Sequence, residues 1–202
     1  LLDKPEAAQS VIRAGIVGVP RNHQDYFSIV VLNHIFGGQF TSRLNMNLRQ
    51  EKGYSYGYNS WIEWHTKSSA IMAGGSVQTS VTAAAVAETL REFEQITGVR
   101  PVDEDEFEGA KAALLQGYPS TFETPWQLLN HIGPIVQFGL HDDYFATYSR
   151  NIRSVTLADV KRVAGARLDR HNLTVLVVGD REVIESDLRL LGSAVVIINH
   201  ES

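Results

Sequence analysis

The sequence predicts an α+β domain whose mixed, largely antiparallel sheet is covered on one face by helices. Branched-aliphatic runs at 9–19 and 172–179 are typical of strands, and a long helical stretch separates them. Two further strand-like segments, 54–63 and 70–77, flank a polar turn and predict a β-hairpin. The regular strand–helix alternation of a parallel sheet is missing from this pattern. With 202 residues, 44% of them hydrophobic, we expect a single domain over 1–202.

The first strand and the helix after it have clear boundary residues. Pro20 closes the strand 9–19, and Asp25 can cap a helix over 26–36, where apolar residues recur at helical spacing. The glycine pair Gly37-Gly38 then ends the helix. Because its sequence, YFSIVVLNHIF, is apolar nearly all round, this helix is predicted to be buried.

A second, short helix is predicted over 42–51, with Thr41 as an alternative start. It places Leu44 and Leu48 four residues apart, on one helical face. Gly53 follows it and is a good C-terminal residue, so the chain turns there into the hairpin.

The next helix is predicted over 80–96 and is amphipathic. Its apolar face is formed by four residues, Val86, Leu90, Phe93 and Ile96. The side predicted to face away from the core is formed by Glu88, Arg91, Glu92 and Gln95.

Capping patterns mark the second half of the chain. Asp103 and Glu106 form a capping box, so the acidic run VDEDEF begins a helix; a metal site is its alternative interpretation. Further helices are predicted at 125–138 with a break or kink near Gly133-Pro134, at 142–151, at 157–168 after the cap Thr156 with Asp159, and at 181–190. The run AVVIINH, 194–200, is predicted to be a last strand.

Composition excludes several classes of function. The formal net charge of -5 argues against nucleic acid or an acidic membrane as partner. There are no cysteines, which excludes disulfides, thiolate zinc sites and cysteine nucleophiles. No apolar run reaches the roughly 18 residues that a membrane span needs, so no span is expected. Because the chain begins at Leu1, we expect a fragment or a processed product of a longer protein.

The histidines do not form a metal motif. None of the seven is spaced i, i+4 from another, and neither HExxH nor HxxEH occurs, so no metal is predicted in this chain. His34 lies in an apolar helix and is interpreted as a core or interface residue. The run His141-Asp142-Asp143 could bind a cation, but a loop or helix start is the preferred interpretation. No GxSxG elbow or serine–histidine pairing supports nucleophilic catalysis.

One cluster, LRQEKGYSYGY from Leu48 to Tyr58, combines an arginine with alternating tyrosines. Arg49 lies near the end of the short helix, and an extended strand would place Tyr54, Tyr56 and Tyr58 on the same face. A guanidinium and a phenol could together hold a substrate carbonyl or a developing oxyanion. The alternative is an aromatic packing face with Arg49 on the surface.

The stretch FGGQFTSRLNMNLRQEKGYSYGY resembles a segment of the pitrilysin/insulinase family of zinc peptidases that reads approximately GGxxSRLxxxLRExxGLAY. The matching positions are Gly37-Gly38, Ser42-Arg43-Leu44, Leu48-Arg49, Gly53 and Tyr56. The segments AQSVIRAG, VDEDEFEGAKAALLQG, TLADVKRVA and LTVLVVGD are also similar to the family's domain in order, so the resemblance extends over essentially the whole chain.

The resemblance implies one half of a two-part peptidase. In the family, a zinc-binding half with HxxEH pairs with a homologous half that lacks it, in one polypeptide or as separate subunits, around a chamber for peptide substrates. This chain resembles the half that lacks the motif. It is then expected to be inactive alone and to hold no cofactor, with Zn²⁺ in the partner half. The rival is an inactive scaffold or assembly subunit, and a bacterial periplasm or cytoplasm is the family-level expectation for location.

The resemblance also implies roles for particular residues. An arginine and a tyrosine of the non-zinc half reach the substrate backbone near the scissile bond, and Arg49 and Tyr56 occupy the matching positions. Tyr54 stands where the family often has leucine, so it remains a second candidate for the substrate-binding tyrosine. Gly37 and Gly38 are predicted to form a turn that lines the chamber, with a plain helix stop as the alternative.

Overall fold

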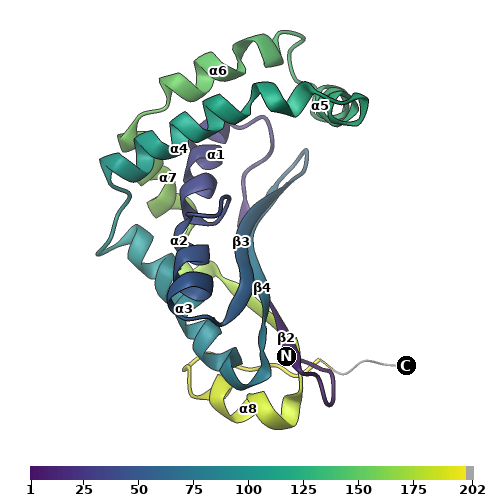
Figure 1. Ribbon diagram of the computed structural model, residues 1–202, viewed down its shortest axis with the longest axis vertical. Coiled ribbons are helices and arrows are strands. Elements are labelled where there is room, and N and C mark those ends of the chain that lie inside the picture. The colour runs from purple at the N-terminus through teal and green to yellow at the C-terminus, as the bar shows by residue number, and fades with distance from the viewer. Residues whose placement is uncertain (199–202) are drawn as a thin grey trace.

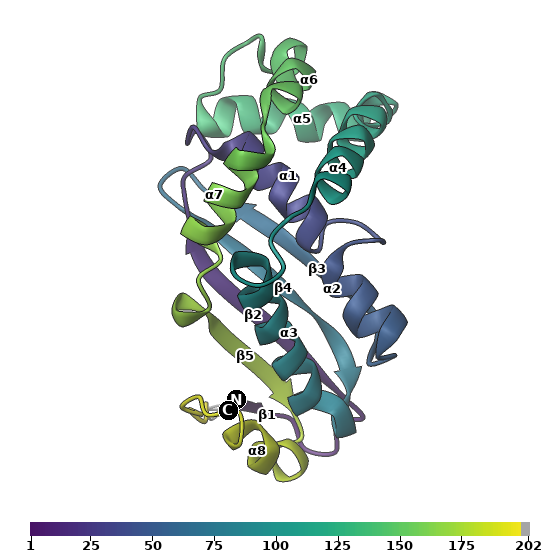
Figure 2. The same ribbon diagram turned by 90° about the vertical axis from the view of Figure 1, so that its left-hand side faces the viewer.

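The computed structural model describes residues 1–198, which form a five-stranded sheet with helices on one face (Figure 1, Figure 2). The strands are β1 (Leu2–Asp3), β2 (Gln9–Gly18), β3 (Ser55–Trp64), β4 (Ser69–Gln78) and β5 (Thr174–Gly179). Their order in the sheet is β1-β5-β2-β4-β3. Strand β2 pairs antiparallel with β4 and β5, β3 pairs antiparallel with β4, and β1 is parallel to β5. The predicted mixed, largely antiparallel sheet and its hairpin are therefore confirmed.

Helices connect and cover these strands. The α-helices are α1 (Tyr26–Phe36), α2 (Arg43–Asn45), α3 (Thr82–Thr97), α4 (Glu104–Gly117), α5 (Pro125–Phe138), α6 (Tyr144–Ser154), α7 (Leu157–Arg167) and α8 (Arg181–Arg189). A π-helix, η1 (Met46–Glu51), continues α2, and short 3₁₀ segments are η2 (Thr79–Val81), η3 (Pro119–Phe122) and η4 (Arg170–Asn172).

The two faces of the sheet differ in what covers them. Along β2, Ile12, Ala14 and Ile16 are buried, whereas Val17 is 80% exposed. Successive side chains of a strand point to opposite faces, so this alternation separates a covered face from an open one. Figure 1 shows α1, α3 and α7 on the covered side, and Figure 2 looks onto these helices from that side.

Helix α1 is buried, as its apolar sequence predicts. It contributes Ile29, Val31, Leu32, Ile35 and Phe36 to the core. At its C-terminal end the ring of Phe36 meets that of Phe93 from α3 edge-on, with 4.7 Å between the centroids.

Helix α3 contradicts one sequence prediction. Glu88 and Glu92 were expected to face away from the core, but Glu92 is only 2% exposed and Glu88 only 9%. The reason is a polar partner: the side-chain amide of Asn47, on η1, donates to Glu88 (3.1 Å) and Glu92 (2.8 Å). Helical periodicity places these carboxylates on the polar side of α3, and η1 covers part of that side.

The short helix predicted over 42–51 has an unexpected geometry. Three residues are α-helical, and the chain then widens into the π-helix η1. A π-turn inserts one residue into a helix, and such turns are frequent at functional sites. Leu44 and Leu48 are both fully buried, as their spacing predicts.

The C-terminal region also differs from the prediction. No strand forms over 194–197; the chain makes an isolated bridge between Leu2 and Ile198, and residues 199–200 of the predicted strand lie outside the described part. Val196 is 70% exposed, whereas Val195 and Ile197 are partly buried and pack against the core. The two-residue strand β1 that contacts this run carries no sequence signal of its own.

Helix α5 lies beyond the end of the sheet, on the side that the other helices leave open (Figure 1). It runs through Pro134 without the predicted break. No residue of α5 is buried. Its neighbour α6 is attached to the sheet region through Arg21, which donates to the Tyr144 hydroxyl (2.7 Å) and lies 3.4 Å from the Tyr26 ring centroid.

None of the helices within residues 1–198 is long and apolar enough to cross a membrane.

Candidate functional site

The residues singled out by the sequence come together along the β3 edge of the sheet. Three segments build this edge: the turn that begins at Gly37, the π-helix η1, and the first residues of β3. Helix η1 packs against β3, and the Tyr54 N–H donates to the Leu48 carbonyl (2.9 Å). The chain thereby folds back so that Arg49 and Tyr56 lie on adjacent elements.

The turn that follows α1 is held tightly against β3. The Gly37 carbonyl accepts a hydrogen bond from the Ser60 N–H (2.9 Å), and a Cβ atom at position 37 would lie 2.3 Å from the Ser60 nitrogen. Only glycine permits this approach without displacement of backbone. Gly38 is exposed and donates to the Asn33 carbonyl (2.8 Å). Close packing accounts for Gly37, while a role for the pair in lining a chamber stays a prediction.

Hydrogen bonds from Arg43 on α2 and Asn47 on η1 hold this segment against α3 and α4. The guanidinium of Arg43, 6% exposed, donates through Nε to Glu106 (2.7 Å) and through Nη2 to the Pro101 carbonyl (3.2 Å). One turn on, Asn47 donates to the buried carboxylates of α3, and Arg100 donates to Glu92 (3.0 Å). These bonds fix η1 on α3 and α4 without using Arg49.

Arg49 is half-buried and lies on an aromatic platform. Its Cζ atom is 4.5 Å from the ring centroid of Phe40, a cation–π distance. Among residues 1–198 its guanidinium makes no hydrogen bond or ion pair. Its five N–H groups are therefore available for an acceptor outside the chain.

A β-bulge at the start of β3 determines where the tyrosines point. Ser55 pairs with Val77 and Tyr58 with Gly75, so three steps along β3 match two steps along β4. The extra residue reverses the alternation. Tyr56 is 89% exposed, whereas Tyr58 is fully buried and its hydroxyl bonds with that of Thr89 (2.7 Å). The prediction that these tyrosines share one face is therefore wrong.

Burial has different chemical consequences for the tyrosines. Desolvation raises the pKa of Tyr58 to about 12, so its phenol stays protonated and serves packing. Tyr54 is half-buried and packs against the hydrophobic core. Tyr56 makes no side-chain hydrogen bond within the described residues, and its hydroxyl is free to donate. The structure thus distinguishes the two candidate tyrosines by their accessibility.

The described residues contain no cluster of three or more histidine and carboxylate groups that could hold a metal. The buried carboxylates Glu88 and Glu92 already have partners in Asn47, Arg91 and Arg100. The polar groups at this edge are therefore suited to hydrogen bonding and charge stabilisation.

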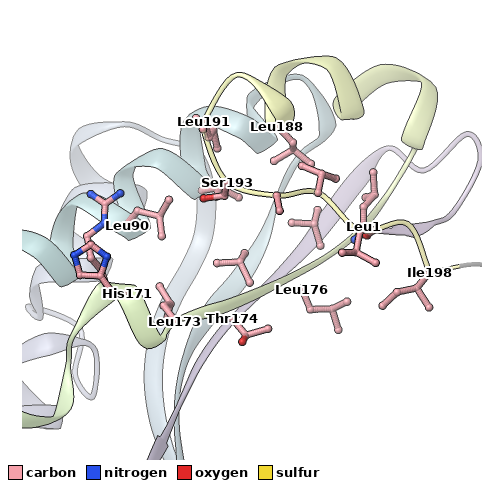
Figure 3. A pocket seen from close by; sticks show the side chains of 18 residues that line it. Leu1, Leu90, His171, Leu173, Thr174, Leu176, Leu188, Leu191, Ser193 and Ile198 are labelled. Carbon is pink, nitrogen blue, oxygen red and sulfur yellow. The ribbon is translucent and has the colours of Figure 1, made fainter.

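A cavity of about 640 Å³ lies at the opposite edge of the sheet (Figure 3). It is bounded by β5, by α3, by α8 and by the chain after α8, with Leu90, Leu173, Leu176 and Leu188 among its walls. Strands β2 and β4 separate it from β3 in the sheet. It does not communicate with the edge that carries Arg49 and Tyr56.

Phe40 and Asn45 belong to this site but were not predicted from the sequence. Phe40 is 54% exposed and supports Arg49, and Asn45 is 2% exposed with both side-chain ends bonded. The sequence signal for Asn45 is weak. It is an asparagine next to Leu44 at a helical position on the buried side of the segment.

Comparison with known proteins gives consistent results. The model of the family described as "Peptidase M16 inactive domain" matches residues 1–114. YmxG of Bacillus subtilis, described as an uncharacterized zinc protease, is 33% identical over 61 residues, which cover 30% of this chain and 15% of that protein. The aligned stretch is thus a small part of that relative.

Solved structures share the fold. The peptidase M16 inactive domain from Pseudomonas fluorescens superposes with a TM-score of 0.79 at 19% identity, over 89% of this chain and 42% of that one. A protease from Helicobacter pylori gives 0.74 at 14% identity, over 88% and 43%. A chain of Complex III2 from Candida albicans gives 0.76 at 15% identity, over 94% and 48%. This chain therefore spans less than half the length of these three.

Proposed function

Because this chain belongs to the peptidase M16 inactive domain family, we propose that it is the non-zinc half of a zinc metallopeptidase and closes the chamber in which peptides are cleaved. The partner would be a homologous zinc-binding half, in the same polypeptide or in a separate subunit. The substrate class is unfolded peptide or small polypeptide. The observation that carries the proposal is an exposed phenol on β3 and a guanidinium without a hydrogen-bond partner among residues 1–198 on η1, two elements that pack against each other at the β3 edge.

Within this proposal, Arg49 and Tyr56 bind and orient the substrate. The partner half would supply Zn²⁺ with its activated water and a glutamate general base. The Arg49 guanidinium and the Tyr56 hydroxyl would donate to the carbonyl oxygen of the peptide backbone and stabilise the negative charge that develops on it. Tyr54, Gly37 and Gly38 would shape the wall next to them.

Two surfaces support pairing with another half. Within residues 1–198 no helix covers the open face of the sheet, and Val17 on that face is 80% exposed (Figure 1). Helix α5 has no Asp, Glu, Lys or Arg, and Trp126 is 69% and Val136 82% exposed. Apolar surface of this kind marks interaction sites. We assign both surfaces to the contact with the partner half.

The proposal is tested by Arg49→Ala and Tyr56→Phe in the assembled enzyme that contains both halves. Each should lower kcat/KM on an unstructured peptide by about 10²- to 10³-fold, as for loss of one oxyanion donor. Zinc content should not change, because in this proposal neither residue is a metal ligand. The matched control is Arg150→Ala, an exposed arginine on α6, which should leave kcat/KM as it is.

Unchanged kcat/KM in both variants would rule out the proposed role of the pair. If the assembled protein binds zinc stoichiometrically and cleaves no peptide, the second candidate applies: a scaffold or assembly subunit. The likeness in fold to a chain of Complex III2 is the observation that favours this candidate.

A further inference from the structure

Arg49 and Tyr56 depend on two separate backbone features. Arg49 rests on the ring of Phe40, which belongs to the turn after α1. Tyr56 points outward because of the bulge in β3. Neither the turn nor the bulge has a complete set of strand or helix hydrogen bonds, so each needs other contacts to hold its shape.

One side chain connects both features. The Asn45 Nδ2 group donates to the Phe40 carbonyl (2.7 Å), and its Oδ1 accepts from the Tyr58 N–H (3.2 Å). Asn45 is 2% exposed, so these bonds do not compete with water. A primary amide is the group that can offer one donor and one acceptor in this way.

The two bonds act beyond the tightly packed part of the turn. Gly37 is held against β3, but Phe40 is 54% exposed, so core packing does not fix the later part of the turn that carries it. In the bulge, side-chain oxygens accept hydrogen bonds from the backbone. Ser55 Oγ accepts from the Gly57 N–H (3.1 Å), and Asn45 Oδ1 accepts from the Tyr58 N–H. The bulge amides are thus satisfied from outside the strand ladder.

We propose that Asn45 is a positioning residue that holds the Arg49 platform and the Tyr56 bulge in one fixed arrangement. It touches neither substrate nor metal and acts through Phe40 and Tyr58. The inference rests on the proposed function, because a positioning role presupposes that Arg49 and Tyr56 bind the reacting carbonyl.

The test uses Asn45→Asp in the assembled enzyme. The aspartate keeps an acceptor for the Tyr58 N–H but places a carboxylate oxygen against the Phe40 carbonyl, so the turn should shift. We expect kcat to fall by about 10- to 100-fold with KM changed by less than about twofold, since a displacement of about 1 Å can have such an effect. Asn151→Asp on α6 is the matched control and should leave kcat unchanged.

Coupling to Arg49 separates positioning from general stability. If Asn45 acts through the Arg49 platform, Asn45→Asp should reduce kcat much less in an Arg49→Ala background than in the wild type. Equal fold-losses in both backgrounds would overturn the inference. Phe40→Leu, at an exposed side chain, is the second variant; it should lower kcat even if Asn45→Asp does not fold, and no loss in kcat would likewise overturn it.

If the proposed function itself is wrong, the variants give a different set of results. If Arg49→Ala and Tyr56→Phe are both without effect, the proposed function fails, and the inference fails with it. If those variants lower kcat/KM while Asn45→Asp and Phe40→Leu match the wild type, only the positioning role of Asn45 is wrong.

Discussion

The β3 edge and helix α5 differ in which side chains are buried and which are exposed. At the β3 edge, polar side chains such as Asn45, Asn47 and Glu92 are buried and hydrogen-bonded, and an aromatic side chain is exposed. Along α5, no residue is buried, and most of the large apolar residues are exposed: Trp126, Leu128, Leu129, Ile132 and Val136. One region is built for fixed geometry and the other for contact area.

This difference indicates how half of a two-part site can work. Buried hydrogen bonds are directional, so they can hold donors within the small tolerance that the proposed contact with a carbonyl oxygen requires. Apolar surface is not directional, and it suits a contact that joins two bodies over a broad area. Changes at the two regions should therefore differ in whether they affect the chain alone or only its assembly.

The largest effect on stability is expected at the end of α1. Gly37→Ala would place a Cβ atom 2.3 Å from the Ser60 nitrogen and 2.5 Å from its hydroxyl, so α1 or β3 must move. We expect the free energy of unfolding, measured by urea denaturation, to fall by about 2 to 3 kcal/mol.

The matched control for this change is Gly109→Ala on the exposed side of α4. No atom lies within 4 Å of a Cβ at that position. Alanine there should raise the free energy of unfolding by up to about 1 kcal/mol, because it favours the helix. If Gly37→Ala leaves the free energy of unfolding unchanged, the β3 edge does not need the close approach of Gly37 to Ser60. The contrast with α5 would then be weaker.

A smaller effect is expected where α1 is attached to α7. Asp25, 4% exposed, accepts from Arg162 (2.7 Å), and this hydrogen bond is the main cause that lowers the pKa of Asp25. Nearby Arg167 and His23 lower it further. Because the folded state binds the proton more weakly than the unfolded state, the stabilisation is complete above the ordinary carboxyl pKa and is lost as pH falls through the folded-state pKa.

Asp25→Asn should remove this contribution. At pH 7 we expect Tm to fall by about 3 °C, since Arg162 is half exposed and its bond is partly screened. The difference in Tm should begin to shrink below the ordinary carboxyl pKa of about 3.9, and it should vanish once Asp25 is protonated in the folded state. A difference in Tm that persists unchanged into strong acid would show that Asp25 acts through packing, and the anchoring of the helix layer would need another explanation.

Local chemistry made much of the fold predictable. The capping boxes at Asp103 and Thr156 are both present, and the helices they begin start where the sequence places them. The hairpin follows from two β-rich runs and a polar turn. Such signals lie within a few residues of one another, and distant contacts are not needed to interpret them.

The sequence predictions that were wrong depend on contacts between residues far apart in the sequence. Glu88 and Glu92 have the spacing of a solvent-facing side, and only the position of Asn47 shows that η1 covers them. The bulge between Ser55 and Tyr58 is a mismatch between two strands, which one strand's sequence does not display. Arg49 and Tyr56 are singled out by their residue types and by the family resemblance, and neither signal points to the buried Asn45.

The smallest effect is expected on α5, where the contrast with the β3 edge is sharpest. Val136 is 82% exposed, so Val136→Gln removes no buried contact and should change the free energy of unfolding of this chain by less than about 0.5 kcal/mol. If α5 contacts the partner half, the same change should weaken assembly, because glutamine adds polar atoms to an apolar contact. Urea denaturation of the chain measures the first quantity, and titration of the two halves, expressed separately, measures the second. A large loss of stability in the chain alone would show that α5 is packed within its own half, and equal affinity for the partner would assign the contact to the open sheet face instead.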